Sequence, residues 1–163
     1  MAKPTKPKKS SKPPQQPTPS SEIVPLGSFL GDDSWHAFAK LGDEYLQAAR
    51  MLNESFKGAP KWPVYQNAFQ ALELYLKAYL RMKGVTVDDL REKFGHRLKD
   101  ALREAKAKGL ALKFDPAAEE AVMEVSELYA DMQLRYTANG QWTLVPLFLV
   151  ISFVDQVRRD ARL

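Results

Sequence analysis

The sequence predicts an all-α protein, a mostly antiparallel bundle of five to six helices. Several stretches place apolar residues at steps of three and four, which is the spacing of one face of a helix. Glycines, prolines and capping residues separate these stretches at short intervals. No stretch shows the sustained alternation of apolar and polar residues that indicates a strand. With 163 residues and no cysteine, the chain can bury one core, but it cannot form disulfides or thiolate metal sites.

The composition divides the chain into two segments. Residues 1–21 are rich in Lys, Pro, Ser and Gln and contain no acidic residue, which predicts a disordered tail. Residues 22–163 contain all the expected helices and form the bundle. The lysines of the tail could add non-specific affinity for nucleic acid or anionic surfaces; a solvated tail without a function of its own is the alternative.

Short loops join the expected helices. The first helix begins after Asp32 and Asp33, which favour the positive end of the helix dipole, and it ends before Pro60 and Pro63. Pro63 suits the first turn of the next helix, which Gly84 closes. The expected helices span, in chain order, residues 34–56, 63–83, 88–94, 98–109, 116–132 and 143–161.

Capping residues mark the later helices. Thr86 precedes a short helix that Gly95 stops, and Asp115 caps a fifth helix that opens with Pro116. An Asn-Gly turn at residues 139–140 is expected in the loop before the last helix.

The net charge of +4 is unevenly distributed. Basic residues concentrate in residues 1–21 and 77–113, whereas residues 22–76 and 114–163 are acidic. The basic middle is compatible with a phosphate-bearing partner, and Lys and Arg that serve only solubility are the alternative. The most apolar run, residues 144–154, is too short to span a bilayer, and the N-terminus has no signal-peptide pattern. We therefore expect a cytoplasmic protein without a membrane partner.

The helix expected over residues 63–83 is apolar on most of its circumference, which is typical of the central helix of a bundle. A line of polar residues nevertheless recurs along it at steps of three and four, so these side chains share one face and meet either water or a ligand. Glu73 and Lys77 in this line have the spacing and order of a helical ion pair, which favours a structural role for them. The line consists of Asn67, Gln70, Glu73, Lys77 and Arg81.

Residues 71–80 have the sequence A-L-E-L-Y-L-K-A-Y-L, Gly84 follows, and residues 95–98 have the sequence G-H-R-L at an expected helix start. This combination resembles the HEPN domain, a small helical bundle named for nucleotide binding in higher eukaryotes and prokaryotes. The resemblance implies a bundle, often a homodimer, that binds RNA or nucleotides. Many members of that family are metal-independent ribonucleases of toxin–antitoxin or defence systems.

The catalytic signature of that family is an Arg followed four to six residues later by a His. Arg91 and His96 match this spacing, and a fixed cation beside an imidazole base suits cleavage of RNA through the ribose 2′-hydroxyl. Arg135 is a second candidate for the cation, with Tyr136 beside it as a ring on which a base could stack. The structural alternative is that His96 orients the start of a helix and that both Arg side chains are simply solvated.

The expected binding surface for RNA or a nucleotide lies in the basic middle and the loop before the last helix. No cofactor or metal is expected, because His36 and His96 lie far apart in the sequence and no glycine-rich phosphate loop occurs. A non-catalytic dimerisation or adaptor module that binds a protein partner is the alternative function. The expected binding residues are Lys77, Arg81, Arg97, Lys99, Arg103 and Tyr136.

Overall fold

The computed structural model describes residues 34–55, 62–135 and 144–163. The predicted tail (1–21), Tyr136 and the predicted Asn-Gly turn (139–140) lie outside the described residues. The all-α prediction is confirmed, because the described ranges contain helices and connecting turns but no strand. Among these residues, no helix has the length and apolar character needed to cross a membrane.

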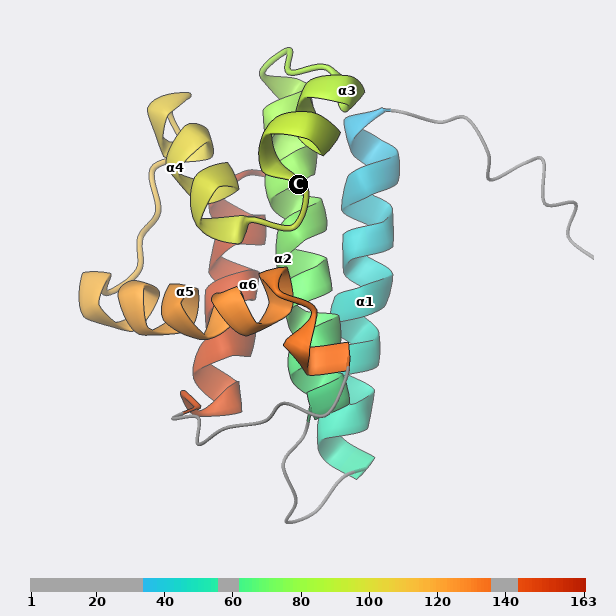
Figure 1. Cartoon of the computed structure of the whole chain (residues 1–163), viewed down its shortest axis with the longest axis vertical. Coiled ribbons are helices and arrows are strands. Elements are labelled where there is room, and N and C mark those ends of the chain that lie inside the picture. Colours follow the sequence, from blue (N-terminus) through green and yellow to red (C-terminus); the bar gives the residue numbers. More distant parts are fainter. Residues whose placement is uncertain (1–33, 56–61, 136–143) are drawn as a thin grey trace, which may run out of the picture. The chain divides into compact units, whose positions relative to one another are not determined.

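The described helices follow the expected order (Figure 1). A π-helical segment, Leu90–Phe94, continues α3, and a 3₁₀ turn, Gln133–Arg135, follows α5. The last helix begins later than the expected residue 143, because Pro146 has an extended backbone with ψ 133° and serves as its N-cap. The α-helices are α1 (Trp35–Ser55), α2 (Trp62–Met82), α3 (Val87–Asp89), α4 (Leu98–Ala107), α5 (Pro116–Ala130) and α6 (Leu147–Asp160).

The predicted capping residues make the expected hydrogen bonds. The hydroxyl of Thr86 accepts from the backbone N–H of Asp89 at 3.1 Å. The carboxylate of Asp115 accepts from the N–H of Ala118 at 2.8 Å. Each bond satisfies a backbone donor that has no partner within its own helix, so these two helix starts are determined locally.

The segment before His96 differs from the regular helix expected there. The N–H of Gly95 donates to the carbonyl of Leu90 at 3.1 Å, five residues earlier, which is the π-helical bond. Gly95 then takes a positive φ of 53°, a conformation that glycine adopts without strain. The wider turn and the glycine together end the helix and turn the chain toward His96.

Helix α2 is the centre of the bundle, as its sequence predicts. It packs most extensively against α1 and also contacts α4, α5 and α6. Figure 1 shows α1, α2 and α6 side by side, with α1 running opposite to the other two and α5 lying across them. Since α2 and α6 run in the same direction, the three intervening helices are needed to return the chain to the start of α6.

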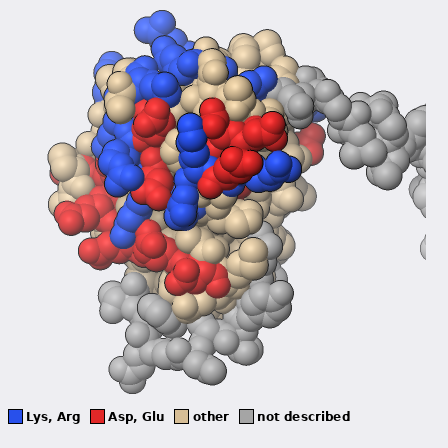
Figure 2. Space-filling model, turned by 45° about the horizontal axis from the view of Figure 1, so that its top comes forward, with Lys and Arg blue, Asp and Glu red and all other residues tan. Residues whose placement is uncertain are grey.

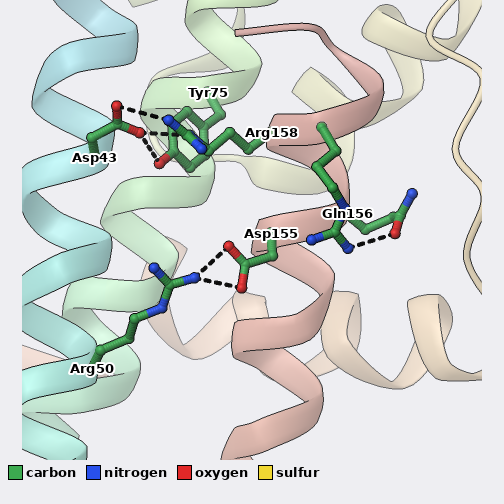
Figure 3. A network of polar contacts seen from close by, with 7 residues as sticks. Asp43, Arg50, Tyr75, Asp155, Gln156 and Arg158 are labelled. Atoms are coloured by element: carbon green, nitrogen blue, oxygen red, sulfur yellow. Dashed lines mark hydrogen bonds and ion pairs between the residues drawn. The ribbon is translucent and has the colours of Figure 1, made fainter.

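Two ion pairs join α1 to α6 (Figure 3). Arg50 contacts both carboxylate oxygens of Asp155 at 2.5 and 2.6 Å. Arg158 contacts both oxygens of Asp43 at 2.7 and 3.1 Å. The hydroxyl of Tyr75 on α2 donates to Asp43 at 2.6 Å, and burial together with this carboxylate raises the pKa of the phenol. Asp43 therefore connects three helices.

Helices α1 and α2 approach each other closely at Gly42. This glycine is buried in the middle of α1, opposite the ring of Tyr75. A Cβ atom added to Gly42 would lie 2.8 Å from Cε1 and 2.9 Å from Cδ1 of that ring. The contact between the two helices thus requires the smallest residue at this position.

The substitution Gly42→Ala tests this contact. Helix propensity alone would stabilise the variant by about 1 kcal/mol. Because the new methyl group would overlap the ring of Tyr75, we expect a loss of about 1–3 kcal/mol in the free energy of unfolding, measured by chemical denaturation. Gln47→Ala, at an exposed position of α1, is the control and should change it by less than about 0.5 kcal/mol. A Gly42→Ala variant more stable than the unmodified protein would contradict the close packing.

Candidate functional site

A buried carboxylate in the central helix organises the candidate site. Glu73 on α2 is only 4% exposed. The ammonium of Lys77 contacts its Oε1 at 2.6 Å, and Nδ1 of His96 lies 2.9 Å from its Oε2. The hydroxyl of Tyr129, on α5, also donates to Oε2. Burying an isolated carboxylate is unfavourable by several kcal/mol, so these three partners are what allows the charge to remain inside the bundle.

The surroundings of Glu73 favour its ionised form. Burial by itself raises the pKa of this carboxyl. The charge of Lys77 and the hydrogen bonds from Lys77, Tyr129 and His96 together outweigh burial and hold the pKa below its ordinary value. Glu73 is therefore an acceptor only, at neutral pH.

This carboxylate determines which nitrogen of the His96 imidazole carries the proton. Because an ionised carboxylate accepts hydrogen bonds, Nδ1 must carry the proton in their contact. In the neutral ring Nε2 is then unprotonated and able to accept a proton. The His96 side chain is 39% exposed, and its ring meets the ring of Tyr129 edge-on with centroids 5.9 Å apart. The site therefore presents an oriented, solvent-accessible imidazole.

The polar line along α2 finds its partners inside the protein. Oε1 of Gln70 lies 2.8 Å from the hydroxyl oxygen of Tyr129, and Asn67 donates to the carbonyl of Pro63 at 2.6 Å. Arg81 donates to the carbonyl of Val85 at 2.8 Å. The side chains of this line therefore have hydrogen-bond partners within the protein, with Glu73 and Lys77 at its centre.

Arg91 and Arg135, the two candidates for the catalytic cation, lie on different elements of the structure. Arg91 is on the π-helical segment, 76% exposed, and pairs with Asp88 at 3.3 Å, whereas His96 pairs with Glu73. Arg135 ends the 3₁₀ turn, which packs against α2 and α5. Nothing is described of its side chain, and Tyr136 lies outside the described residues.

Three of the cations expected to bind RNA, Arg97, Lys99 and Arg103, lie on an exposed surface but have acidic neighbours. Arg97 and Arg103 both pair with Asp100, at 3.1 and 2.7 Å. Lys99 on α4 pairs with Glu127 on α5 at 3.3 Å. Figure 2 shows Lys and Arg side chains interleaved with Asp and Glu on this face. The basic middle of the sequence is therefore partly neutralised in space, because α5 places its acidic residues beside α4.

Two residues of the site were not predicted as such. The sequence predicts that Glu73 pairs with Lys77 but not that it pairs with His96, and Tyr129 is not among the predicted site residues. A signal for Glu73 exists in the sequence, since a carboxylate surrounded by apolar residues in a central helix must be paired. Nothing comparable singles out Tyr129, whose role depends on how α5 crosses α2.

The described residues contain no group of three or more His, Asp or Glu side chains that could hold a metal ion. A comparison with protein-family models, with curated proteins and with solved structures finds no match for this chain. The HEPN resemblance therefore rests on the residues quoted for it, and the geometry around Glu73 is the observation on which a function can be proposed.

The pH dependence of stability tests the buried carboxylate. Because the pKa of Glu73 is lowered in the folded state, its contribution is fully present above the ordinary value of 4.5 and is lost as the pH falls through the folded value. We expect Glu73→Gln to lower the free energy of unfolding by about 3 kcal/mol at pH 7, since Lys77 loses its partner. The difference from the unmodified protein should shrink below about pH 4.

Denaturant titrations at pH 7 and pH 3.5 measure both effects. Glu124→Gln, at an exposed position of α5, is the matched control and should be close to neutral at both pH values. An equal loss of stability for the Glu73 and Glu124 variants would contradict the paired, buried state of Glu73.

Proposed function

We propose that this helical bundle binds RNA or nucleotides at the surface beside His96 and that His96 acts as a general base on a bound ribose. One observation carries the proposal: a solvent-accessible imidazole whose Nδ1 is held by a buried, ionised carboxylate. A carboxylate in this position orients the ring and stabilises the imidazolium that forms when Nε2 accepts a proton. The resemblance to HEPN ribonucleases agrees with the proposal.

The reaction needs only groups of this chain, the substrate and water. Nε2 of His96 removes the proton of a 2′-hydroxyl, and the resulting oxygen attacks the adjacent phosphorus. The bond from phosphorus to the 5′ oxygen breaks, and that oxygen takes a proton from water. The hydroxide that remains takes the proton from Nε2 of His96, which returns the imidazole to its neutral form. The products are a 2′,3′-cyclic phosphate and a 5′-hydroxyl end, and no metal ion takes part.

The ion pairs of the binding surface do not prevent phosphate binding. Arg97, Lys99 and Arg103 are 46–78% exposed at their side chains. Exposed ion pairs of this kind contribute about 0–1 kcal/mol each, so a phosphate can replace the carboxylate at little cost. Binding through such contacts weakens steeply as the salt concentration rises.

Substitution of the two histidines tests the catalytic part. We expect His96→Ala to reduce the rate of RNA cleavage by at least about 100-fold, the usual contribution of a general base. His36→Ala is the matched control, because His36 is the other histidine, is exposed, and stacks on Trp35 at a centroid distance of 3.5 Å. Cleavage should be assayed in EDTA, with detection of the 2′,3′-cyclic phosphate. Cleavage that survives His96→Ala at full rate would refute the role of His96.

Salt dependence tests the binding part. Removal of one phosphate contact, as in Arg103→Gln, should make the negative slope of log K against log salt for single-stranded RNA less steep by about 0.7. Glu120→Gln on α5, an exposed position without a predicted contact, should leave the slope unchanged or make it steeper. An RNA affinity independent of salt would contradict binding through the cations of α4.

A protein-binding adaptor is the second candidate, and the neutralised surface favours it. Lys77, Arg97, Lys99 and Arg103 all have carboxylate partners within the chain, so the described surface is not a continuous positive patch. Under this alternative His96 completes the pairing of Glu73 and has no catalytic role. Absence of RNA binding at low salt, together with a partner complex that persists at high salt, would favour the adaptor.

A further inference from the structure

One oxygen of the buried carboxylate is shared by two donors. Oε2 of Glu73 accepts from the hydroxyl of Tyr129 and lies 2.9 Å from Nδ1 of His96, whereas Oε1 contacts the ammonium of Lys77. Each donor that binds a carboxylate oxygen withdraws part of its negative charge from the other donors. Tyr129 and His96 therefore draw on the same charge, although they come from different parts of the chain.

The proton of the Tyr129 hydroxyl has two described acceptors. One is Oε2 of Glu73, and the other is Oε1 of Gln70, which lies 2.8 Å from the hydroxyl oxygen. A hydroxyl group donates one proton, and an ionised carboxylate is a stronger acceptor than an amide oxygen. Since the surroundings of Glu73 favour its ionised form, the proton lies toward Glu73. The phenol thus donates to the same oxygen that orients His96.

Packing fixes the position of the Tyr129 ring. The side chain is 2% exposed, and its ring lies 6.1 Å from the ring of Phe69 and 5.9 Å from that of His96, between centroids. A buried ring in such contacts has little freedom to change rotamer. A hydrogen bond in the interior is also electrostatically stronger than one at the surface. The bond from Tyr129 to Glu73 is therefore a fixed part of the surroundings of His96.

We propose that Tyr129 is a positioning residue that, through the shared oxygen of Glu73, limits how strongly His96 binds a proton. Oε2 of Glu73 stabilises the positive charge that forms when Nε2 of His96 accepts a proton. The hydrogen bond from Tyr129 weakens this stabilisation, because it withdraws negative charge from Oε2. The catalytic consequence rests on the proposed function: a base that binds its proton less strongly is free to act at lower pH.

The other charged groups on the elements around His96 do not depend on the Tyr129 hydroxyl. Lys77 binds the second oxygen of Glu73, and the remaining groups have partners of their own. Removal of the hydroxyl therefore changes the donors to Oε2 and leaves these charges in place. The groups are Lys77 on α2, Lys93 on the π-helical segment, Arg97, Lys99 and Asp100 at the start of α4, and Glu127 on α5.

An NMR titration of the full chain carrying Tyr129→Phe tests the proposal without RNA. The chain contains two histidines, so the Hε1 signals of His36 and His96 can each be followed against pH. We expect the titration midpoint of His96 to move to higher pH by at least about 0.5 pH unit, because Oε2 loses a donor that competes with the imidazolium. The signal of His36 is the internal reference and should titrate as before.

Tyr79→Phe is the matched control. Tyr79 is also a buried tyrosine, 5% exposed, but its hydroxyl donates to the backbone carbonyl of Lys108 at 3.2 Å and not to Glu73. This variant loses one buried hydroxyl, as Tyr129→Phe does, and should leave the titration midpoint of His96 unchanged. It separates an effect on His96 from a general loss of stability.

A second change at the same position should reverse the sign. Replacing Tyr129 with 3-fluorotyrosine keeps the ring and the hydroxyl and makes the phenol a stronger donor, because fluorine withdraws electrons. The titration midpoint of His96 should then move to lower pH, and this arm remains informative if Tyr129→Phe does not fold. A midpoint that stays in place, that moves in the same direction in both variants, or that moves equally in Tyr79→Phe would overturn the proposal.

The cleavage assay separates this inference from the proposed function. If the protein cleaves RNA, Tyr129→Phe should move the acidic limb of the pH profile of kcat/KM to higher pH by the same amount as the NMR midpoint. Cleavage with an acidic limb that Tyr129→Phe leaves in place contradicts the inference and not the proposed function. A shifted NMR midpoint in a protein that cleaves no RNA contradicts the proposed function and supports the coupling of Tyr129 to His96.

Discussion

The buried carboxylate of Glu73 is the interaction on which the candidate site depends. A charge in the interior of a bundle is tolerated only with close partners, and each partner comes from a different part of the chain. Lys77 lies one turn further along α2, His96 follows the π-helical segment, and Tyr129 lies on α5. The need to pair one charge therefore joins α2, the start of α4 and α5, and it leaves one histidine with a defined orientation at the surface.

The bundle around this carboxylate is assembled from contacts of different chemical kinds. Between α1 and α2, a glycine permits the ring of Tyr75 to approach the backbone. Between α1 and α6, partly exposed ion pairs of Asp43 and Arg50 join the two helices. Helix α1 therefore contacts α2 through close apolar packing and α6 through charged side chains.

The distribution of charge changes between sequence and structure in a way that bears on function. Along the chain, the basic and acidic segments are separate. In space, Glu119 and Glu127 on α5 pair with lysines of α4. Asp100 pairs with both Arg97 and Arg103. A nucleic acid would therefore have to exchange with existing ion pairs. Such exchange is sensitive to the salt concentration. The proposed activity therefore depends more on the position of His96 than on the total charge of the surface.

The all-α class, the order of the helices, the caps at Thr86 and Asp115 and the central place of α2 can all be predicted from the sequence. These features depend on periodicity and on local hydrogen bonds, which the sequence contains directly. It also singled out His96, through the Gly-His pair at a helix start. The contacts of His96 with Glu73 and Tyr129, in contrast, follow only from the way the helices pack. The reason is physical: a long-range pair depends on how helices cross, and no local spacing encodes that crossing.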